Sequence, residues 1–372
     1  MRKKILFIVN VDWFFVSHRL PLALEALAKG YEVSIACAVT DKQEYLEEIG
    51  IRVYPLSISR SKKGLFGELQ DFISIYKTLR QVAPDIVHFV TIKPVLYGGI
   101  STRFLPVIKK KVFSISGLGF VFIKEGSRAA LIKKVVKFLY FIALHGEKSH
   151  VIVQNPDDKA VIQSICKVPI TLIRGSGVDL EEYNCSDNSN ENVTIVMACR
   201  LLRDKGVFEY VKAAEIVSKK NSNANFELYG DIDQDNPASL TEKDIKKIEA
   251  DSIVKVYGFS KNISTVFERA DIVVLPSYRE GLPKVLIEAA ACGRAVVTTD
   301  VPGCRDAIEV HKTGLLCKVK DAQDLAKKIK HLIINKELRK KMGKAGKELA
   351  QKEFDIKKVV DKHFEIYEDE NE

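Results

Sequence analysis

Short runs of apolar, often β-branched residues alternate with longer segments of helical periodicity along the whole chain. A strand is expected where a run of roughly four to eight such residues is bounded by turn residues. Strands are therefore predicted at 5–9, 33–37, 52–54, 86–90, 111–114, 151–154, 171–173, 194–198, 225–229, 253–257, 272–275, 295–298 and 315–317. Helices are predicted between them, for example at 20–29, 42–49, 67–81 and 207–219.

Near-continuous apolar strands separated by helices are typical of parallel sheets covered on both faces. Two successive strand–helix series predict an α/β protein with two doubly wound, Rossmann-like domains that face each other across a cleft. The polar stretch 183–191 marks the linker, and 372 residues exceed the ~250–300 at which one core stops growing. We expect domains at 1–180 and 181–352, with a C-terminal helix at 353–372 packing back on the first.

Charge is distributed unevenly along the chain. The net charge is +9, yet residues 1–150 hold 23 lysines and arginines against 12 acidic residues, a surplus of 11. The remaining residues hold 35 against 37, a deficit of 2. This asymmetry indicates an anionic partner for the N-terminal half, which leaves open nucleic acid, a phosphorylated substrate or an acidic membrane surface.

The N-terminal apolar run, the length of the apolar stretches and the cysteines indicate the cellular compartment. A basic start and an apolar run resemble a signal peptide, but Asn10 and Asp12 interrupt the run and no cleavage site follows, so a first strand explains it better. No stretch of ~18 uninterrupted apolar residues exists. Seven cysteines are scattered along the chain, and no two of them form a C-x-x-C pair. This spacing argues against a zinc site or a redox motif. This usage fits a reducing cytoplasm.

The segment 276–288, PSYREGLPKVLIE, carries the clearest chemical signal. It joins the strand expected at 272–275 to a helix in which Pro283 suits the first turn and Gly293 the position after the last. The loop 280–282 therefore lies at a helix N-terminus and at the carboxyl edge of a sheet. Free backbone amides and the positive end of the helix dipole favour a diphosphate there.

Two carboxylates flank this loop. Glu280 precedes the helix and would lie beside whatever is attached to the phosphates, whereas Glu288 lies roughly 8–9 Å further along. A carboxylate at that depth is suited to accept both hydroxyls of a ribose. The alternative is a solvated loop residue and a helix residue in an ion pair.

A second basic constellation follows the strand expected at 194–198. Arg200, Lys205 and Gly206 occupy the loop that leads into the helix expected at 207–219, so a second anion site is expected there. A planar guanidinium and a mobile ammonium are complementary ways to hold a diphosphate. An ordinary basic surface loop is the alternative.

With these elements in this order, the chain resembles the retaining family 4 glycosyltransferases of the GT-B fold. Their E-x7-E element matches Glu280 to Glu288, and their diphosphate-binding Arg and Lys-Gly match Arg200 and Lys205-Gly206. A Gly-rich junction at 175–179 and the loop around Gly258 are lesser matches. The likeness covers almost the whole chain and is most specific in its C-terminal half.

The resemblance implies a role for each matching residue. Glu280 would contact the hydroxyls of the donor sugar and Glu288 the ribose, while Arg200 and Lys205 would stabilise the leaving nucleoside diphosphate. The remaining donor-binding residues would be Gly281, Leu282, Pro283 and, beside the base, Gly258. A UDP-sugar donor is implied, and neither a metal nor another cofactor.

The N-terminal half departs from the family pattern. Its first loop, residues 10–19, has no glycine, and no histidine stands in the region 114–120. Gly117 and Gly119 still permit a close backbone approach, and His18 is a candidate for orienting a hydroxyl or phosphate, with a structural histidine as the alternative. Both departures occur in bacterial enzymes that build surface polysaccharides such as O-antigen on lipid carriers.

These features together predict transfer of a hexose or N-acetylhexosamine to a polyprenyl-diphosphate-linked glycan. The enzyme would be cytoplasmic and peripheral on the inner face of the plasma membrane.

The apolar segment 128–144, with Lys133, Lys134 and Lys137, is either a membrane-surface helix or a core helix with a solvated lysine face. Asp231, Asp233 and Asp235 resemble an EF-hand start but lack its glycine and glutamate, which favours a solvated loop.

The sequence leaves three rival functions. A sugar-nucleotide epimerase of the same fold would release UDP without an acceptor. A nucleic-acid-binding protein would use the basic half, but no RNA-binding aromatic motif, helix-turn-helix or zinc spacing supports it. An NAD-dependent dehydrogenase would need G-x-G-x-x-G after the first strand, and that motif is missing.

Overall fold

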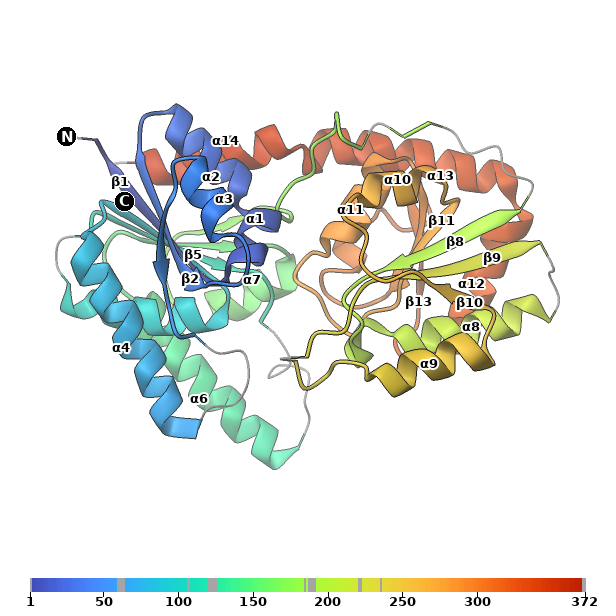
Figure 1. Ribbon diagram of the computed structural model, residues 1–372, viewed down its shortest axis with the longest axis horizontal. Coiled ribbons are helices and arrows are strands. Elements are labelled where there is room, and N and C mark those ends of the chain that lie inside the picture. The colour runs from blue at the N-terminus through green and yellow to red at the C-terminus, as the bar shows by residue number, and fades with distance from the viewer. Residues whose placement is uncertain are drawn as a thin grey trace. The chain divides into compact units, whose positions relative to one another are not determined.

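The chain forms two compact units, each built around its own parallel sheet (Figure 1). The computed structural model describes residues 2–58, 64–105, 108–118, 126–183, 185–186, 192–219, 223–234 and 236–369. The N-terminal unit comprises Met1–Ser176 and Lys357–Glu372, and the C-terminal unit comprises Gly177–Ile356.

The N-terminal unit contains a seven-stranded sheet in the order β3-β2-β1-β4-β5-β6-β7, with every neighbouring pair parallel. Apolar side chains occupy nearly every position of the central strands, which both faces bury. All seven predicted strands are confirmed to within two residues. They are β1 (Lys4–Val11), β2 (Glu32–Ala38), β3 (Arg52–Pro55), β4 (Ile86–Val90), β5 (Lys110–Ile115), β6 (Ser149–Val153) and β7 (Ile170–Leu172).

Helices cover both faces of this sheet. In Figure 1, α1, α2, α3 and α14 lie above it, and α4 and α6 lie below. Ile75 and Leu79 of α4 and Tyr140 of α6 enter the core on the lower side. The helical elements of this unit are α1 (Asp12–His18), α2 (Leu20–Ala28), α3 (Gln43–Glu48), α4 (Gly64–Val82), η1 (Pro94–Gly98), α5 (Gly99–Ser101), η2 (Thr102–Phe104), α6 (Ser127–Leu144), α7 (Pro156–Gln163) and α14 (Ile356–Glu368).

The residues after β1 form the helix α1, so the loop expected at 10–19 is wrong. Asp12, fully buried at its start, accepts hydrogen bonds from the backbone amides of Trp13 (2.7 Å) and Thr40 (2.7 Å) and from the Thr40 hydroxyl (2.6 Å). Phe15 packs edge-on against Phe7, with 5.5 Å between ring centroids. The missing glycine is therefore compatible with a helix that Asp12 ties to the neighbouring loop.

A buried polar cluster holds α14 on the N-terminal unit. His88 in β4 is bonded through Nδ1 to the Tyr367 hydroxyl and through Nε2 to the Ser114 hydroxyl, both at 2.6 Å. Burial lowers the pKa of His88 well below its usual value and that of His363 to about 3. Both rings are therefore neutral near neutral pH, and the last helix completes a unit whose other elements precede residue 177.

The C-terminal unit contains a six-stranded parallel sheet in the order β10-β9-β8-β11-β12-β13. The six predicted strands are confirmed as β8 (Val193–Ala198), β9 (Ala224–Tyr229), β10 (Val254–Val256), β11 (Ile272–Leu275), β12 (Ala295–Thr299) and β13 (Gly314–Cys317). From β8 the strand order runs one way, and from β11 it runs the other. Ligands of such sheets bind at this switch point, outside the carboxyl ends of the strands.

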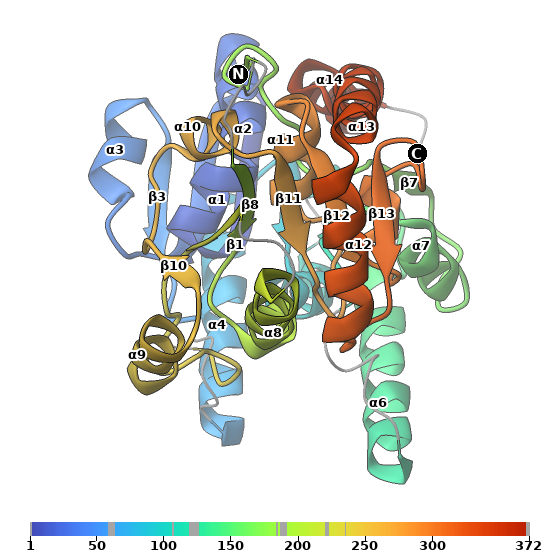
Figure 2. The same cartoon turned by 90° about the vertical axis from the view of Figure 1, so that its right-hand side faces the viewer.

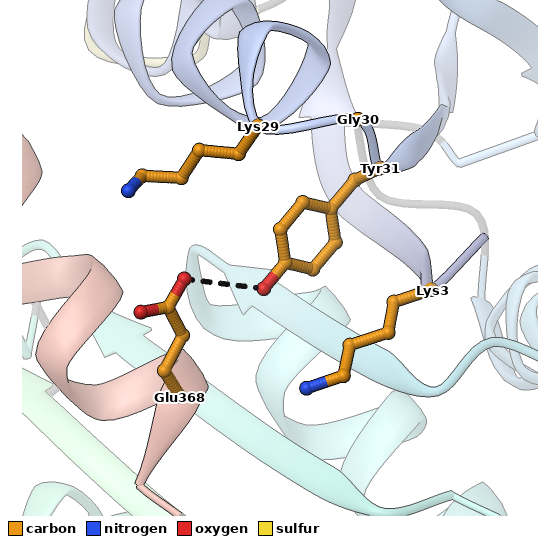
Figure 3. A pocket seen from close by; sticks show the side chains of 5 residues that line it. All are labelled: Lys3, Lys29, Gly30, Tyr31 and Glu368. Carbon is orange, nitrogen blue, oxygen red and sulfur yellow. Dashed lines mark hydrogen bonds between the residues drawn. The ribbon is translucent and has the colours of Figure 1, made fainter.

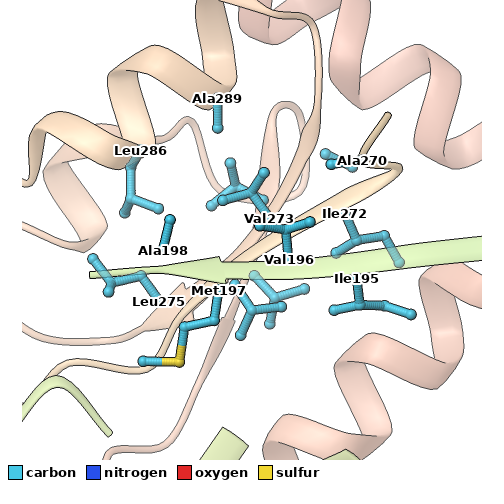
Figure 4. Packing of buried hydrophobic residues seen from close by; sticks show 14 of the residues in the cluster. Ile195, Val196, Met197, Ala198, Ala270, Ile272, Val273, Leu275, Leu286 and Ala289 are labelled. Carbon is cyan, nitrogen blue, oxygen red and sulfur yellow. The ribbon is translucent and has the colours of Figure 1, made fainter. Parts of the chain in front are cut away.

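Helices flank this second sheet as well. Figures 1 and 2 show α8, α9 and α12 on one side and α10, α11 and α13 on the other. Leu286 and Ala289 of α11 pack against β8 and β11, as Figure 4 shows, and so fix the start of α11 over the switch point. The helical elements are η4 (Arg203–Lys205), α8 (Val207–Ser218), α9 (Glu242–Asp251), α10 (Ile263–Glu268), α11 (Lys284–Ala291), η5 (Arg305–Ala307), α12 (Ala322–Ile334), α13 (Lys336–Leu349) and η6 (Ala350–Phe354).

Two of the scattered cysteines are not free. A disulfide joins Cys185 to Cys292, 107 positions along the chain, so it ties the linker stretch to the end of α11. Cys37 is a buried free cysteine, and burial raises the pKa of its thiol to about 12. Across the described part of the chain, every helix is too short or too polar to cross a membrane.

Candidate active site

The loop between β11 and α11 lies at the switch point of the C-terminal sheet. Pro283 stands immediately before the helix, with φ −71° and ψ 121°, one position earlier than the expected first turn. Gly293 follows the helix with φ +66°, as expected for its end. No side chain caps the first turn of α11. The backbone amides and the positive dipole end of this helix start therefore favour an anion there.

Two neighbouring loops fix the backbone of this loop. The Tyr278 amide donates to the Asp204 carbonyl at 2.9 Å, and the Glu280 amide donates to the Pro302 carbonyl at 3.2 Å. At Gly303, whose φ is +81°, a methyl group would lie 2.5 Å from the Glu280 carbonyl oxygen. Gly303 is thus needed both for its backbone conformation and for its lack of a side chain.

Lys205 and Glu280 form an ion pair at this point, although 75 positions separate them. Their side chains are 18% and 13% exposed. Burial alone would lower the pKa of Lys205, but the charge of Glu280 and its hydrogen bond outweigh burial and raise that pKa. Lys205 is therefore a cation at neutral pH, held beside the uncapped start of α11.

Arg200 lies near this pair but is bonded elsewhere. Its Nη1 donates to Asp233 Oδ2 at 2.8 Å, while its charge also acts on Lys205 and opposes the rise of that pKa. The Asp231 carboxylate accepts from the Phe259 amide at 3.1 Å. In the loop expected to be solvated, Asp231 and Asp233 therefore both have partners. Asp235 lies outside the described residues, and the described part of the chain holds no group of three or more metal-ligating side chains.

Glu288 is buried within α11, with 6% of the residue exposed. Its Oε1 accepts a hydrogen bond from the Tyr183 hydroxyl at 2.9 Å. The same oxygen forms an ion pair with Lys284 Nζ at 3.2 Å. Burial and Glu288 both raise the pKa of Tyr183, so its phenol stays a donor. Tyr183 was missed from the sequence because it begins the polar stretch interpreted as a linker.

The remaining donor-side candidates shape the backbone. Leu282 is buried in the hydrophobic core of the C-terminal unit, so only its backbone is available to a ligand. Gly258 follows β10 with φ +67°, and its carbonyl accepts from the Gly230 amide at 2.8 Å. Beside it, Tyr257 stacks on Tyr229 with ring centroids 4.9 Å apart. Glu280, Lys205 and Gly281 therefore converge, whereas Gly258 belongs to the loop after the edge strand.

The N-terminal candidates belong to the other unit. His18 ends α1 and stacks on Phe14, with 4.1 Å between ring centroids. Gly117 follows β5 with φ +113°, which suits a glycine. Gly119 lies outside the described residues. Their proposed roles stay predictions.

Three polar side chains missed from the sequence stand at the carboxyl ends of β1, β4 and β5, which are adjacent strands. Asn10 Oδ1, Thr91 Oγ1 and Ser116 Oγ are buried, and none has a hydrogen-bond partner within the part of the chain that the structure describes. Thr91 also has φ +75°, which is strained for a β-branched residue. Buried side-chain oxygens without hydrogen-bond partners are suited to bind a ligand rich in hydroxyl groups.

A hollow in the N-terminal unit is lined by Lys3, Lys29, Gly30, Tyr31 and Glu368 (Figure 3). The Tyr31 hydroxyl donates to Glu368 at 3.4 Å. Lys3 and Tyr31 immediately precede β1 and β2, so the hollow lies at the amino edge of its sheet. Ligands of this fold bind at the opposite edge, and the hollow is not a candidate site.

Comparison with known protein families gives a match for each half. Residues 182–349 match the model of group 1 glycosyl transferases, and residues 4–155 match a glycosyl transferase 4-like model. The first match contains the two motifs at 200–206 and 280–288 in full.

Individual proteins show the same likeness over the full length. A Campylobacter jejuni protein, N,N'-diacetylbacillosaminyl-diphospho-undecaprenol alpha-1,3-N-acetylgalactosaminyltransferase, is 26% identical over 94% of each chain. An Escherichia coli UDP-Gal:alpha-D-GlcNAc-diphosphoundecaprenol alpha-1,3-galactosyltransferase is 23% identical over 91% of this chain and 89% of its own. The structure of Anabaena Alr3699/HepE with UDP and glucose superimposes with a TM-score of 0.76 at 19% identity, covering 99% and 100% of the two chains, and shows the shared fold.

Proposed function

Because this chain is a glycosyltransferase with the GT-B fold, we propose that it moves a hexose or N-acetylhexosamine from a UDP-sugar to a polyprenyl-diphosphate-linked glycan. The anomeric configuration would be retained, and the product would belong to surface polysaccharide. The reaction breaks the bond between the anomeric carbon and the diphosphate and forms a bond between that carbon and an acceptor hydroxyl oxygen, so that UDP leaves and takes up the hydroxyl proton. In this proposal the N-terminal domain takes the acceptor and the C-terminal domain takes the donor.

The ion pair of Lys205 and Glu280 at the uncapped start of α11 is the observation that supports this function best. The reaction leaves negative charge on the departing diphosphate, and a fixed cation beside the backbone amides of a helix N-terminus stabilises that charge in the transition state. Lys205 is therefore proposed to face the diphosphate, with the amides of Gly281 and the first turn of α11. No metal is required in this scheme, since these groups supply the positive charge.

The two glutamates would hold the ends of the donor. Glu280 is already bonded to Lys205 and would turn its second oxygen to a sugar hydroxyl, while Glu288 would accept the ribose hydroxyls. Arg200 is proposed to exchange Asp233 for a diphosphate oxygen, because its side chain is 41% exposed and its present partner lies on a loop. This exchange would couple donor binding to the position of the loop at 231–233.

The choice of UDP and of a lipid-linked acceptor rests on relatives. The named activities of the Campylobacter and Escherichia enzymes include a diphospho-undecaprenol acceptor, and the Escherichia name includes UDP-Gal. The Anabaena structure contains UDP. The basic surplus of residues 1–150 would then serve an acceptor diphosphate and an anionic membrane on the cytoplasmic side.

A donor and acceptor panel tests the proposal. Nucleotide release is measured from UDP-, GDP- and ADP-sugars, each with and without a polyprenyl-diphosphate-linked glycan. We expect release from a UDP-sugar only when the acceptor is present. Release of UDP and free sugar without acceptor would favour the epimerase, and tight nucleic-acid binding at physiological salt would favour the basic-protein alternative.

Tyr183 is expected to govern donor affinity through Glu288. In Tyr183→Phe the buried carboxylate loses one of its two bonded partners, and a hydrogen bond to a charged group contributes about 1.5–3 kcal/mol. We therefore expect the KM for the UDP-sugar to rise about ten-fold or more, with little change in kcat, in steady-state kinetics. Tyr31→Phe, which removes a tyrosine–glutamate bond in the other unit, is the matched control. Equal KM values for the two variants would contradict this role.

A further inference from the structure

The solvent side of α6 carries a stripe of large apolar side chains. Tyr140, Ala143 and Leu144 face the core of the N-terminal unit and are fully buried or nearly so. With 3.6 residues per turn, Leu131, Val135 and Phe138 fall on the opposite stripe, and they are 65%, 51% and 61% exposed. A helix that only packs on a sheet would present polar residues there. The expected solvated lysine face therefore covers only part of the exposed surface.

The start of α4 adds to this surface. Phe66, Leu69 and Ile73 recur at helical spacing and are 90%, 54% and 40% exposed. The amino-terminal halves of α4 and α6 project from the sheet to the same side in both Figure 1 and Figure 2. We call the set on these two helices the apolar face; it consists of Phe66, Leu69, Ile73, Leu131, Ile132, Val135 and Phe138.

Positive charge accompanies the apolar face. Lys134 and Lys137 are exposed beside the stripe on α6, whereas the partly exposed Lys133 falls on the same side of the helix as Tyr140. Residues 127–144 contain no acidic residue. On α4, Lys93 Nζ lies 3.0 Å from a carboxylate oxygen of Glu68 and 3.0 Å from one of the buried Asp71. The exposed surface of α6 is therefore apolar and cationic, which complements the headgroups and acyl chains of an anionic bilayer.

We propose that the apolar face is a membrane-docking surface. On it, α4 and α6 insert their exposed side chains into the headgroup region of the nearer leaflet of an anionic lipid bilayer. Neither helix is long and apolar enough to cross it, so the contact is interfacial. The lysine flank disfavours a second copy of this chain as the occupant, since a symmetric contact would bring like charges together. The inference rests on the proposed function in one respect, because a lipid-linked acceptor would lie in the same membrane.

Vesicle flotation of the purified full chain tests the proposal. Vesicles of phosphatidylcholine are compared with vesicles that also contain phosphatidylglycerol, at low and physiological salt. We expect binding only to the anionic vesicles, weakened at least ~10-fold in Leu131→Ser with Phe138→Ser, since two large apolar side chains are lost. Lys134→Glu with Lys137→Glu should weaken binding by ~25-fold at low salt, about five-fold for each lysine.

Matched controls lie on the other unit. Ile334→Ser alters an apolar residue that is 64% exposed on α12, and Lys340→Glu with Lys341→Glu alters two exposed lysines on α13; both should bind as wild type. Turnover with a short-chain, water-soluble acceptor should be unchanged in all variants, which also verifies folding.

Two results would overturn the membrane-docking surface. One is vesicle binding that is absent in the wild type or equal in all variants. The other is a wild-type dimer in sedimentation that Leu131→Ser with Phe138→Ser converts to a monomer. If no preparation turns over any donor while the binding differences appear, the proposed function fails and the docking surface stands.

Discussion

Replacing Lys205 by alanine is expected to lower kcat by at least ~10²–10³-fold while the protein stays folded. The ammonium is a partly buried cation whose pKa is raised by Glu280 despite its burial. It is therefore charged throughout the pH range in which a transferase operates. Removing it withdraws a fixed positive charge from the position proposed for the leaving diphosphate. Rates of sugar transfer at saturating donor measure the effect, and Glu280→Gln should show a loss of similar order.

A surface ion pair in the same unit provides the control for this experiment. Lys212 pairs with Glu215 on α8 at 2.8 Å, with side chains 61% and 35% exposed. Such an exposed pair contributes only about 0.2–1 kcal/mol to stability. Lys212→Ala should therefore leave kcat within two-fold of wild type. Thermal melts of all three variants separate lost chemistry from lost structure. Wild-type rates in both Lys205→Ala and Glu280→Gln would refute the site assignment.

Gly303→Ala is expected to reduce kcat by about 10²-fold, although Gly303 carries no chemistry of its own. The added methyl group would lie 2.5 Å from the Glu280 carbonyl oxygen and 2.6 Å from that of Gly281. The contact is backbone on backbone, so the 280–282 loop must move. A displacement of about 1 Å at a catalytic group is enough for a loss of this size.

Gly293→Ala separates displacement from backbone strain. Gly293 also has a positive φ, +66°, but a methyl group there would meet nothing closer than 3.6 Å. Both substitutions should destabilise the fold by roughly 1–2 kcal/mol through the left-handed conformation. Only Gly303→Ala should also lose activity, measured as kcat at saturating donor. Equal loss in the two variants would attribute the effect to stability rather than to the position of Glu280.

Most of the fold could be predicted from the sequence. Apolar runs such as Ile272–Leu275 are short and are followed by turn residues. A strand that is buried on both faces is apolar throughout, so it can be identified from its own residues without knowledge of the strands beside it. The helix α11 could be bounded because proline before it and glycine after it act locally on φ. The wrong prediction, a loop at 10–19, was taken over from the family pattern, whereas the aromatic residues there belong to α1.

The candidate site was predictable only in part. Glu280, Glu288, Arg200 and Lys205 could be proposed because each stands beside a predicted strand end or helix start. Which of them meet was not predictable. Arg200 is bonded to Asp233, and Lys205 alone reaches Glu280.

The sequence by itself determined the two parallel sheets, the loops at their carboxyl edges and the residue types that suit an anionic, hydroxyl-bearing ligand. Each of these depends on periodicity and on backbone preferences within a few neighbouring residues. Only the tertiary structure decided that Tyr183 holds Glu288, that Gly303 supports the loop of Glu280 and that the solvent side of α6 carries an apolar stripe. Those contacts join residues far apart in the chain, or depend on which side of a helix is covered, and local sequence carries no signal for either.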